Sequence, residues 1–118
     1  MDAKAIDQLL ESQRQYFLSG ATLPVEFRIA MLQRLRETVR RREPDISKAL
    51  TADLGKSGYE GYMCEIGLVL SELGYLIRHT RRFAKRRHVP TTLAQFAASS
   101  YLSPSPYGNV LIMSPWNY

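Results

Sequence analysis

The sequence predicts a mostly α-helical chain, with about four helices followed by two short strands. From Ile6 to Ile77, hydrophobic side chains recur three or four residues apart, the spacing that places them on one face of a helix. After Pro90 this spacing gives way to short apolar runs between proline, glycine and serine, a pattern typical of strands and turns. We therefore divide the chain into a helical region, residues 1–88, and a region of loop and strands, residues 89–118, within one incomplete domain.

Each predicted helix has a boundary that local sequence explains. Ser19-Gly20 follows the first helix, and Pro24 can occupy the first turn of the second. Pro44 ends the second helix, because proline disfavours helical backbone at the residue before it, and can itself open the third. Gly55 is the expected cap at the end of the third helix. The predicted helices cover about residues 2–18, 24–43, 44–54 and 59–87.

The fourth predicted helix is the longest, although Gly61, Gly67 and Gly74 interrupt its apolar spacing. Each glycine disfavours a helix by about 1 kcal/mol relative to alanine. We therefore expect one or two of these glycines to lie where a neighbour packs closely. Residues 78–87 hold six arginines and lysines, which we interpret as the solvated last turns of this helix, where cations complement the helix dipole.

Two strands are predicted near the end of the chain. Residues 100–103 form the first, and residues 109–113 form the second. The run from Val110 to Met113 is continuously apolar and lies between a Pro-x-Gly turn and Ser-Pro, which is typical of a buried strand. Such a strand would deliver Trp116 and Asn117 to its C-terminal end, where ligands bind in open α/β sheets.

Charge is distributed unevenly along the chain, whose net charge is +5. From His88 to Tyr118 there is no Asp, Glu, Lys or Arg. An exposed tail would normally carry charge for solubility, so we expect this stretch to be covered by other protein. The chain is accordingly expected to be a piece of a longer protein.

Several functional classes have little support in the sequence. No apolar run approaches the roughly 20 residues of a membrane span, and there is no signal-peptide pattern. We therefore expect a cytoplasmic protein by default. Cys64 cannot form an internal disulfide, which fits a reducing compartment, and we interpret it as an ordinary helix residue. His79 and His88 have no metal-ligand spacing, and no metal site is expected.

Two alternatives to an enzyme stay open from the residues themselves. The basic run at residues 78–87 could make the chain a small helical module that binds nucleic acid or anionic lipid. The uncharged tail could instead add a strand to a partner's sheet, as an interaction protein would. For the basic run, the solvated end of a helix is the simpler interpretation, and we expect no nucleic-acid partner.

The residues with catalytic potential lie at the end of the chain. An asparagine that emerges from a buried strand can donate its amide to a developing oxyanion, a task that needs a fixed, neutral donor in a dry site. Asn117 has this position in the sequence. Asparagine is equally suited to capping a turn or the start of a helix, so chemistry alone leaves both roles open.

The final stretch resembles a segment of a known family. Residues 106–118 read PYGNVLIMSPWNY, which is similar to the Pro-x-Gly-Val-apolar-apolar-x-x-Pro-Trp-Asn-Tyr/Phe segment of the aldehyde dehydrogenase superfamily. Upstream, GATLPVEFR at residues 20–28, LTADLGK at residues 50–56 and the tyrosine-rich helix with Glu65 and Ile66 are similar to the short N-terminal region of the class 3, fatty-aldehyde-like branch. The resemblance covers nearly the whole chain in consistent order.

The resemblance implies roles for five residues. Asn117 would donate its amide to the thiohemiacetal oxygen formed when the catalytic cysteine attacks an aldehyde. Ser114, Pro115 and Trp116 would lie beside the nicotinamide end of NAD or NADP, and Tyr118 would border the aldehyde channel. The intact protein would then be an α/β enzyme, and residues 109–113 would resemble the first strand of a Rossmann-like coenzyme domain.

The same resemblance implies that other parts of the enzyme lie downstream of Tyr118. These are the catalytic cysteine, which Cys64 does not match, the general-base glutamate and the groups that hold the adenosine ribose. We therefore expect the isolated chain to be inactive and the full-length enzyme to be a homodimer that oxidises small-molecule aldehydes.

Overall fold

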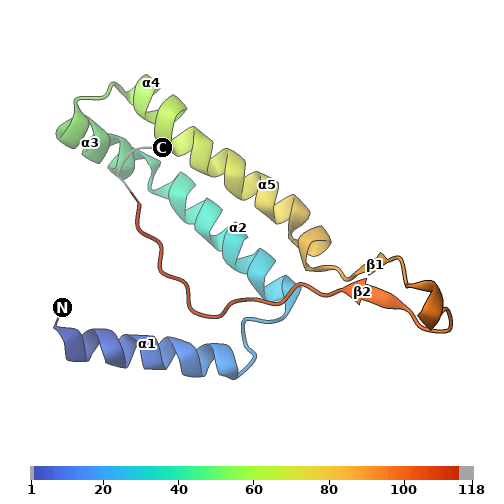
Figure 1. Cartoon of the computed structure of the whole chain (residues 1–118). Coiled ribbons are helices and arrows are strands. Elements are labelled where there is room, and N and C mark those ends of the chain that lie inside the picture. Colours follow the sequence, from blue (N-terminus) through green and yellow to red (C-terminus); the bar gives the residue numbers. More distant parts are fainter. Residues whose placement is uncertain (1, 115–118) are drawn as a thin grey trace.

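The computed structural model describes residues 2–114 and confirms a mostly helical chain with two short strands (Figure 1). The helical elements are α1 (Ala3–Leu18), α2 (Val25–Arg41), α3 (Glu43–Leu54), the one-turn α4 (Gly58–Gly61), the π-helical turn η1 (Tyr62–Ile66) and α5 (Gly67–Ala84). The strands are β1 (Arg87–Val89) and β2 (Ser100–Leu102), separated by the 3₁₀ turn η2 (Leu93–Gln95). They form an antiparallel hairpin in which His88 lies opposite Tyr101.

The predicted helix boundaries follow local signals. The Asp2 carboxylate accepts a hydrogen bond from the Ala5 amide over 2.8 Å and caps α1. Pro24 directly precedes α2, and Pro44 lies in the first turn of α3. Gly55 ends α3 with a φ of 66°, as its predicted capping role requires.

The core lies between α2 and α5, which run antiparallel and side by side (Figure 1). Its buried hydrophobic residues are Ile29 of α2 together with Ile66, Leu70 and Leu73 of η1 and α5. At one end of the pair, the Arg81 guanidinium of α5 contacts the Glu26 carboxylate of α2 through two hydrogen bonds of 3.0 and 2.6 Å. The apolar stripes predicted for the second and fourth helices thus meet as one small core.

The fourth predicted helix differs from the prediction at its beginning, where a π turn separates α4 from α5. The Gly67 amide donates to the Tyr62 carbonyl five residues earlier, which is the π-helical pattern. A Cβ atom at Gly67 would lie only 2.9 Å from that oxygen, so glycine allows this turn to close. Gly61 is also buried, against Leu50 of α3, which confirms the expectation of close packing at the glycines.

The end of the fourth predicted helix also differs from the prediction. Helix α5 stops at Ala84, and Lys85 is already extended, with φ −76° and ψ 136°. Residues 87–89 pair with β2 in place of continuing the helix, and the Arg86 guanidinium lies 4.8 Å from the centre of the Tyr101 ring. Strand pairing and this cation–π contact therefore outweigh the helical charge pattern of the basic run.

The predicted strand at residues 109–113 is not a strand in the described structure. Val110, Leu111, Ile112 and Met113 are 68 to 84% exposed, so the run is not buried either. A strand needs a neighbouring strand for its backbone hydrogen bonds, and in the described sheet β1 and β2 pair only with each other. Among residues 2–114, no other strand is available to this run.

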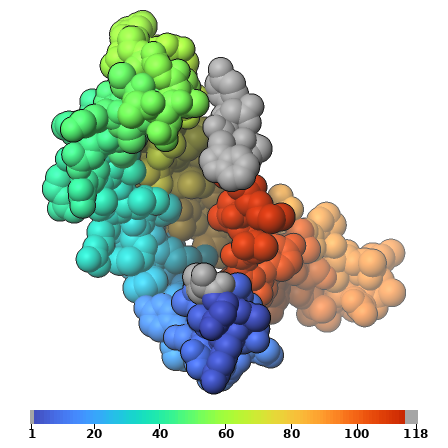
Figure 2. Space-filling view, turned by 90° about the vertical axis from the view of Figure 1, so that its left-hand side faces the viewer, coloured from blue at the N-terminus to red at the C-terminus, as the bar shows by residue number. Residues whose placement is uncertain are grey.

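Helix α1 lies apart from the other helices, and the segment that follows β2 returns between α1 and α2 (Figures 1 and 2). The apolar face of α1 stays half exposed, with Ile6, Leu9 and Leu10 between 44 and 49% accessible. The chain has a radius of gyration of 20.0 Å, whereas a compact domain of this length would have one of about 13 Å. The shape is therefore extended, and little of the apolar surface is covered.

Candidate functional site

The predicted site lies at the end of the segment that follows β2. Ser114 is exposed, and it is the last residue that the structure describes. Pro115, Trp116, Asn117 and Tyr118 lie outside the described residues, so their roles stay predictions. What the structure describes is the segment of residues 103–114 that leads to the site, which we call the approach segment.

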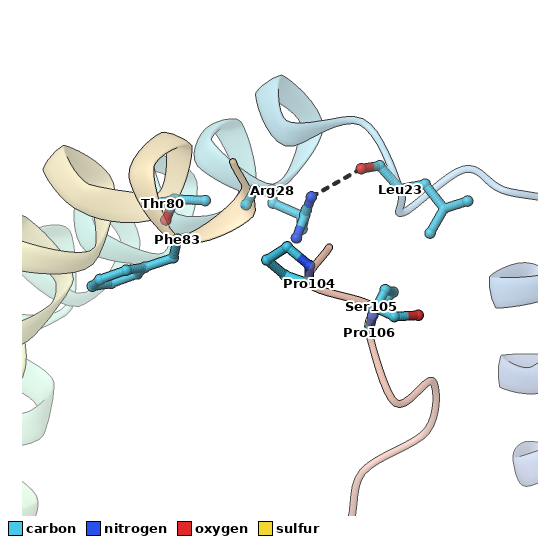
Figure 3. Close-up of a pocket in the computed structure, with 8 residues that line it drawn as sticks. Leu23, Arg28, Thr80, Phe83, Pro104, Ser105 and Pro106 are labelled. Carbon is cyan, nitrogen blue, oxygen red and sulfur yellow. Dashed lines mark hydrogen bonds between the residues drawn. The ribbon is translucent and has the colours of Figure 1, made fainter. Parts of the chain in front are cut away.

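The approach segment first contacts the main helix pair. Pro104, Ser105 and Pro106 form one wall of a pocket of about 310 Å³ (Figure 3). Residues from the start of α2 and the end of α5 form the other wall, among them Arg28 and Phe83. The Arg28 side chain donates a hydrogen bond to the Leu23 carbonyl over 3.0 Å and faces the prolines. Arg28 is thereby held by the loop before α2 and faces the beginning of the approach segment across the pocket.

The next contact explains the glycine of the Pro-x-Gly motif. Gly108 has a φ of 94°, a backbone conformation that other residues rarely adopt. A Cβ atom at this position would lie 3.4 Å from the Phe17 ring of α1. Gly108 is half-buried, whereas the Tyr107 side chain beside it is fully exposed. The motif therefore brings the backbone itself against α1.

Asn109 attaches the approach segment to the middle of α1. Its side-chain amide donates to the Leu10 carbonyl over 3.1 Å, joining positions that are 99 residues apart in the sequence. Among the described residues, this is the last hydrogen bond before Ser114. Sequence reasoning missed Asn109 because an asparagine beside a turn has an ordinary local explanation, and no pattern in the sequence relates it to Leu10.

Lys56 and Glu65 form the other notable polar contact. The lysine Nζ lies 2.5 Å from a carboxylate oxygen of Glu65, and the two side chains are 19% and 29% exposed. The hydrogen bond to Glu65 raises the pKa of Lys56, against the lowering effect of burial. The pair connects the loop after α3 to the π turn. Cys64, one residue away, is half-buried within that turn, in agreement with its interpretation as a helix residue.

His79 and three arginines of the basic run, Arg81, Arg82 and Arg86, contact neighbouring side chains or backbone. His79 stacks on Tyr75, with the ring centres 4.1 Å apart, and its Nδ1 lies 2.8 Å from the Tyr75 carbonyl oxygen. Arg82 lies over Phe83 at 5.6 Å. Together with the contacts of Arg81 and Arg86, this arrangement favours a structural interpretation of the basic run.

Two further features of the described residues bear on the metal-binding and membrane classes considered above. Residues 2–114 contain no cluster of three or more His, Cys, Asp or Glu side chains that could hold a metal ion. None of the helices described is both long and apolar enough to cross a membrane.

Comparison with known proteins agrees with the family resemblance of the sequence. The aldehyde dehydrogenase family model matches residues 1–118. Similar proteins include 4,4'-diaponeurosporen-aldehyde dehydrogenase of Staphylococcus aureus (strain NCTC 8325 / PS 47), 34% identical over 96% of this chain and 25% of the relative. Aldehyde dehydrogenase family 3 member A2 of Macaca fascicularis is 35% identical over 96% of this chain and 23% of the relative.

The name of a third relative also states its assembly and its cofactor preference. The dimeric NADP-preferring aldehyde dehydrogenase of Canis lupus familiaris is 36% identical over 96% of this chain and 25% of the relative. The chain thus spans about a quarter of the length of each of these relatives.

Proposed function

Because the chain belongs to the aldehyde dehydrogenase family, in its class 3 branch, we propose that it is the N-terminal part of an enzyme that oxidises aldehydes to carboxylic acids. The observation that carries this proposal is the match of the family model to residues 1–118. The contacts of the approach segment support it, because they anchor the chain shortly before the Pro-Trp-Asn motif. The isolated chain is proposed to be inactive.

We assign Asn117 to oxyanion stabilisation. In the whole enzyme, a cysteine thiolate outside this chain would form a bond to the aldehyde carbon, and the carbonyl electron pair would move to the oxygen. The Asn117 amide would donate a hydrogen bond to that oxygen as its negative charge develops. An amide suits this role because it donates without titrating. Tyr118 would border the channel through which the aldehyde arrives.

We assign Ser114, Pro115 and Trp116 to the nicotinamide end of NAD or NADP, which supplies the hydride acceptor when bound. Ser114 fits this assignment because it is exposed and offers a neutral hydroxyl and peptide group. No charged residue lies between His88 and Tyr118, so this stretch suits an uncharged carboxamide better than the phosphates. Any lysine or arginine that pairs with the phosphates would have to come from elsewhere in the enzyme.

The remaining proposals concern assembly, the choice of cofactor and the location in the cell. The canine relative is named dimeric and NADP-preferring, which supports a homodimer and the use of NADP as well as NAD. A cytoplasmic location stays a prediction, which the lone Cys64 fits.

The test is an assay of the full-length protein with a series of aldehydes, each with NAD and with NADP. We expect reduced cofactor and carboxylic acid to form in equal amounts. A series of aldehydes of increasing chain length would define the substrate class. Absence of turnover with both cofactors across the series, in a protein shown to be folded, would contradict the proposed function.

A further inference from the structure

We propose that α1 braces the approach segment, and that Phe17 and Asn109 are positioning residues that act through Asn117. This inference rests on the proposed function, because it gives a catalytic consequence to contacts that lie away from the reacting atoms. Its basis is the set of contacts between α1 and residues 108–110.

Three observations place α1 against the approach segment. The Asn109 amide donates to the Leu10 carbonyl over 3.1 Å, and the Gly108 backbone lies against the Phe17 ring. A pocket of about 310 Å³ beside these contacts is lined by residues of both elements, including Tyr16 and Val110, and by Thr22 and Arg28. These contacts combine a directional hydrogen bond with the close approach of the Gly108 backbone to the Phe17 ring, and both hold the segment beside α1.

The position of α1 in the fold favours this role. Helix α1 does not pack along another helix, and Figure 1 shows it separated from the α2–α5 pair by the approach segment. Phe17 is half-buried, although most of the apolar face of α1 is exposed. Phe17 is therefore covered at the point where the approach segment crosses the helix. The contact of α1 with the approach segment is a main link between this helix and the rest of the described chain.

The brace is placed where it can influence the site. Asn109 makes the last hydrogen bond of the described chain before Ser114, and Asn117 follows eight residues after Asn109 in the sequence. Leu111 and Met113 are 82 and 84% exposed, so α1 holds the approach segment only at residues before Leu111. Displacement of a catalytic group by about 1 Å can lower a rate substantially. Loss of the brace should therefore reduce the effectiveness of the Asn117 amide.

A double-mutant cycle in the full-length enzyme tests this inference. We expect Asn109→Ala to lower kcat about fivefold, the effect of losing one hydrogen bond, and Phe17→Leu to lower it by a similar factor. Asn109→Gln retains a donor and should recover part of the loss. In an Asn117→Ala background, the additional effect of Asn109→Ala should fall below about twofold, because residues that act through one group are not additive.

Gln8→Ala serves as the matched control, since Gln8 is an exposed amide on α1 and lies outside the proposed brace. We expect its kcat to equal that of the wild type. Thermal unfolding of every variant separates loss of fold from loss of positioning, and Phe17→Leu provides a second route if Asn109→Ala does not fold.

Two results would overturn the inference, and only the second would also contradict the oxyanion role of Asn117. If Asn109→Ala lowered kcat equally with and without Asn117, positioning through Asn117 would be wrong while the proposed function remained. If Asn117→Ala alone left kcat unchanged, the oxyanion role would fail and the brace would fail with it. Aldehyde oxidation by the wild type is the separate measure of the proposed function.

Discussion

Replacement of Gly67 by alanine should destabilise the protein, although the same substitution in a helix normally stabilises it. Exchange of glycine for alanine in a helix interior contributes about 1 kcal/mol of stability. At Gly67, however, the new Cβ atom would lie 2.9 Å from the Tyr62 carbonyl oxygen, which already accepts the Gly67 amide. Overpacking of this kind costs about 1–3 kcal/mol, so we expect a net loss of about 1 kcal/mol.

Gly74→Ala is the matched control within the same helix. Its Cβ atom would meet only the ends of flexible side chains, Arg78 at 3.4 Å and Arg36 at 3.9 Å. We expect this variant to gain up to about 1 kcal/mol. Native-state hydrogen exchange of the α5 amides measures the free energy of opening in both variants. If Gly67→Ala stabilised α5 as much as Gly74→Ala, our account of the π turn would be wrong.

Three further predictions follow from contacts elsewhere in the structure. The pKa of Lys56 is raised above 10.5 by its hydrogen bond to Glu65, so this contribution to stability is complete below pH 10.5 and is lost as the pH rises through the folded-state pKa. The difference in unfolding free energy between wild type and Glu65→Gln should therefore shrink above that pH, and a constant difference would count against the pair. The contact between Glu26 and Arg81 is exposed, at 69 and 65%, so Glu26→Gln should lower the unfolding free energy by less than about 1 kcal/mol, with no effect in high salt. Gly108→Ala should lower the unfolding free energy by about 1–2 kcal/mol because of its positive φ, and denaturant unfolding that matched the wild type would refute this.

Helix boundaries could be predicted from the sequence because their signals are local. Pro24 and Pro44 restrict the backbone beside them whatever the rest of the chain does, and Gly55 supplies the left-handed conformation that ends α3. The core positions Ile29 and Leu70 could be predicted because helical spacing places them on one face.

The π turn and the first strand could not be predicted in the same way. Helical periodicity does not distinguish an α turn from a π turn, because both keep Ile66 near the apolar face. Residues 87–89 become a strand only because residues 100–102 lie beside them, and that pairing is not local. The charge pattern of the basic run predicted a helix through Arg87, whereas the helix ends at Ala84.

The approach segment shows the limit of pattern reasoning most clearly. The apolar run from Val110 to Met113 resembles a buried strand in composition, yet burial depends on a neighbour that the described residues do not include. The candidate site residues could be proposed from the resemblance alone. The anchoring of Gly108 and Asn109 on α1 became visible only in three dimensions, because it joins the two ends of the described chain.

The most direct test of the central claim is the turnover of full-length Asn117→Ala with an aldehyde and saturating NAD or NADP. We predict that kcat falls by about 10²- to 10³-fold, the usual effect of removing an oxyanion donor, while the cofactor dissociation constant stays within about twofold of the wild type. An unchanged kcat in a folded variant would contradict the assignment of Asn117 and the account of the site built on it.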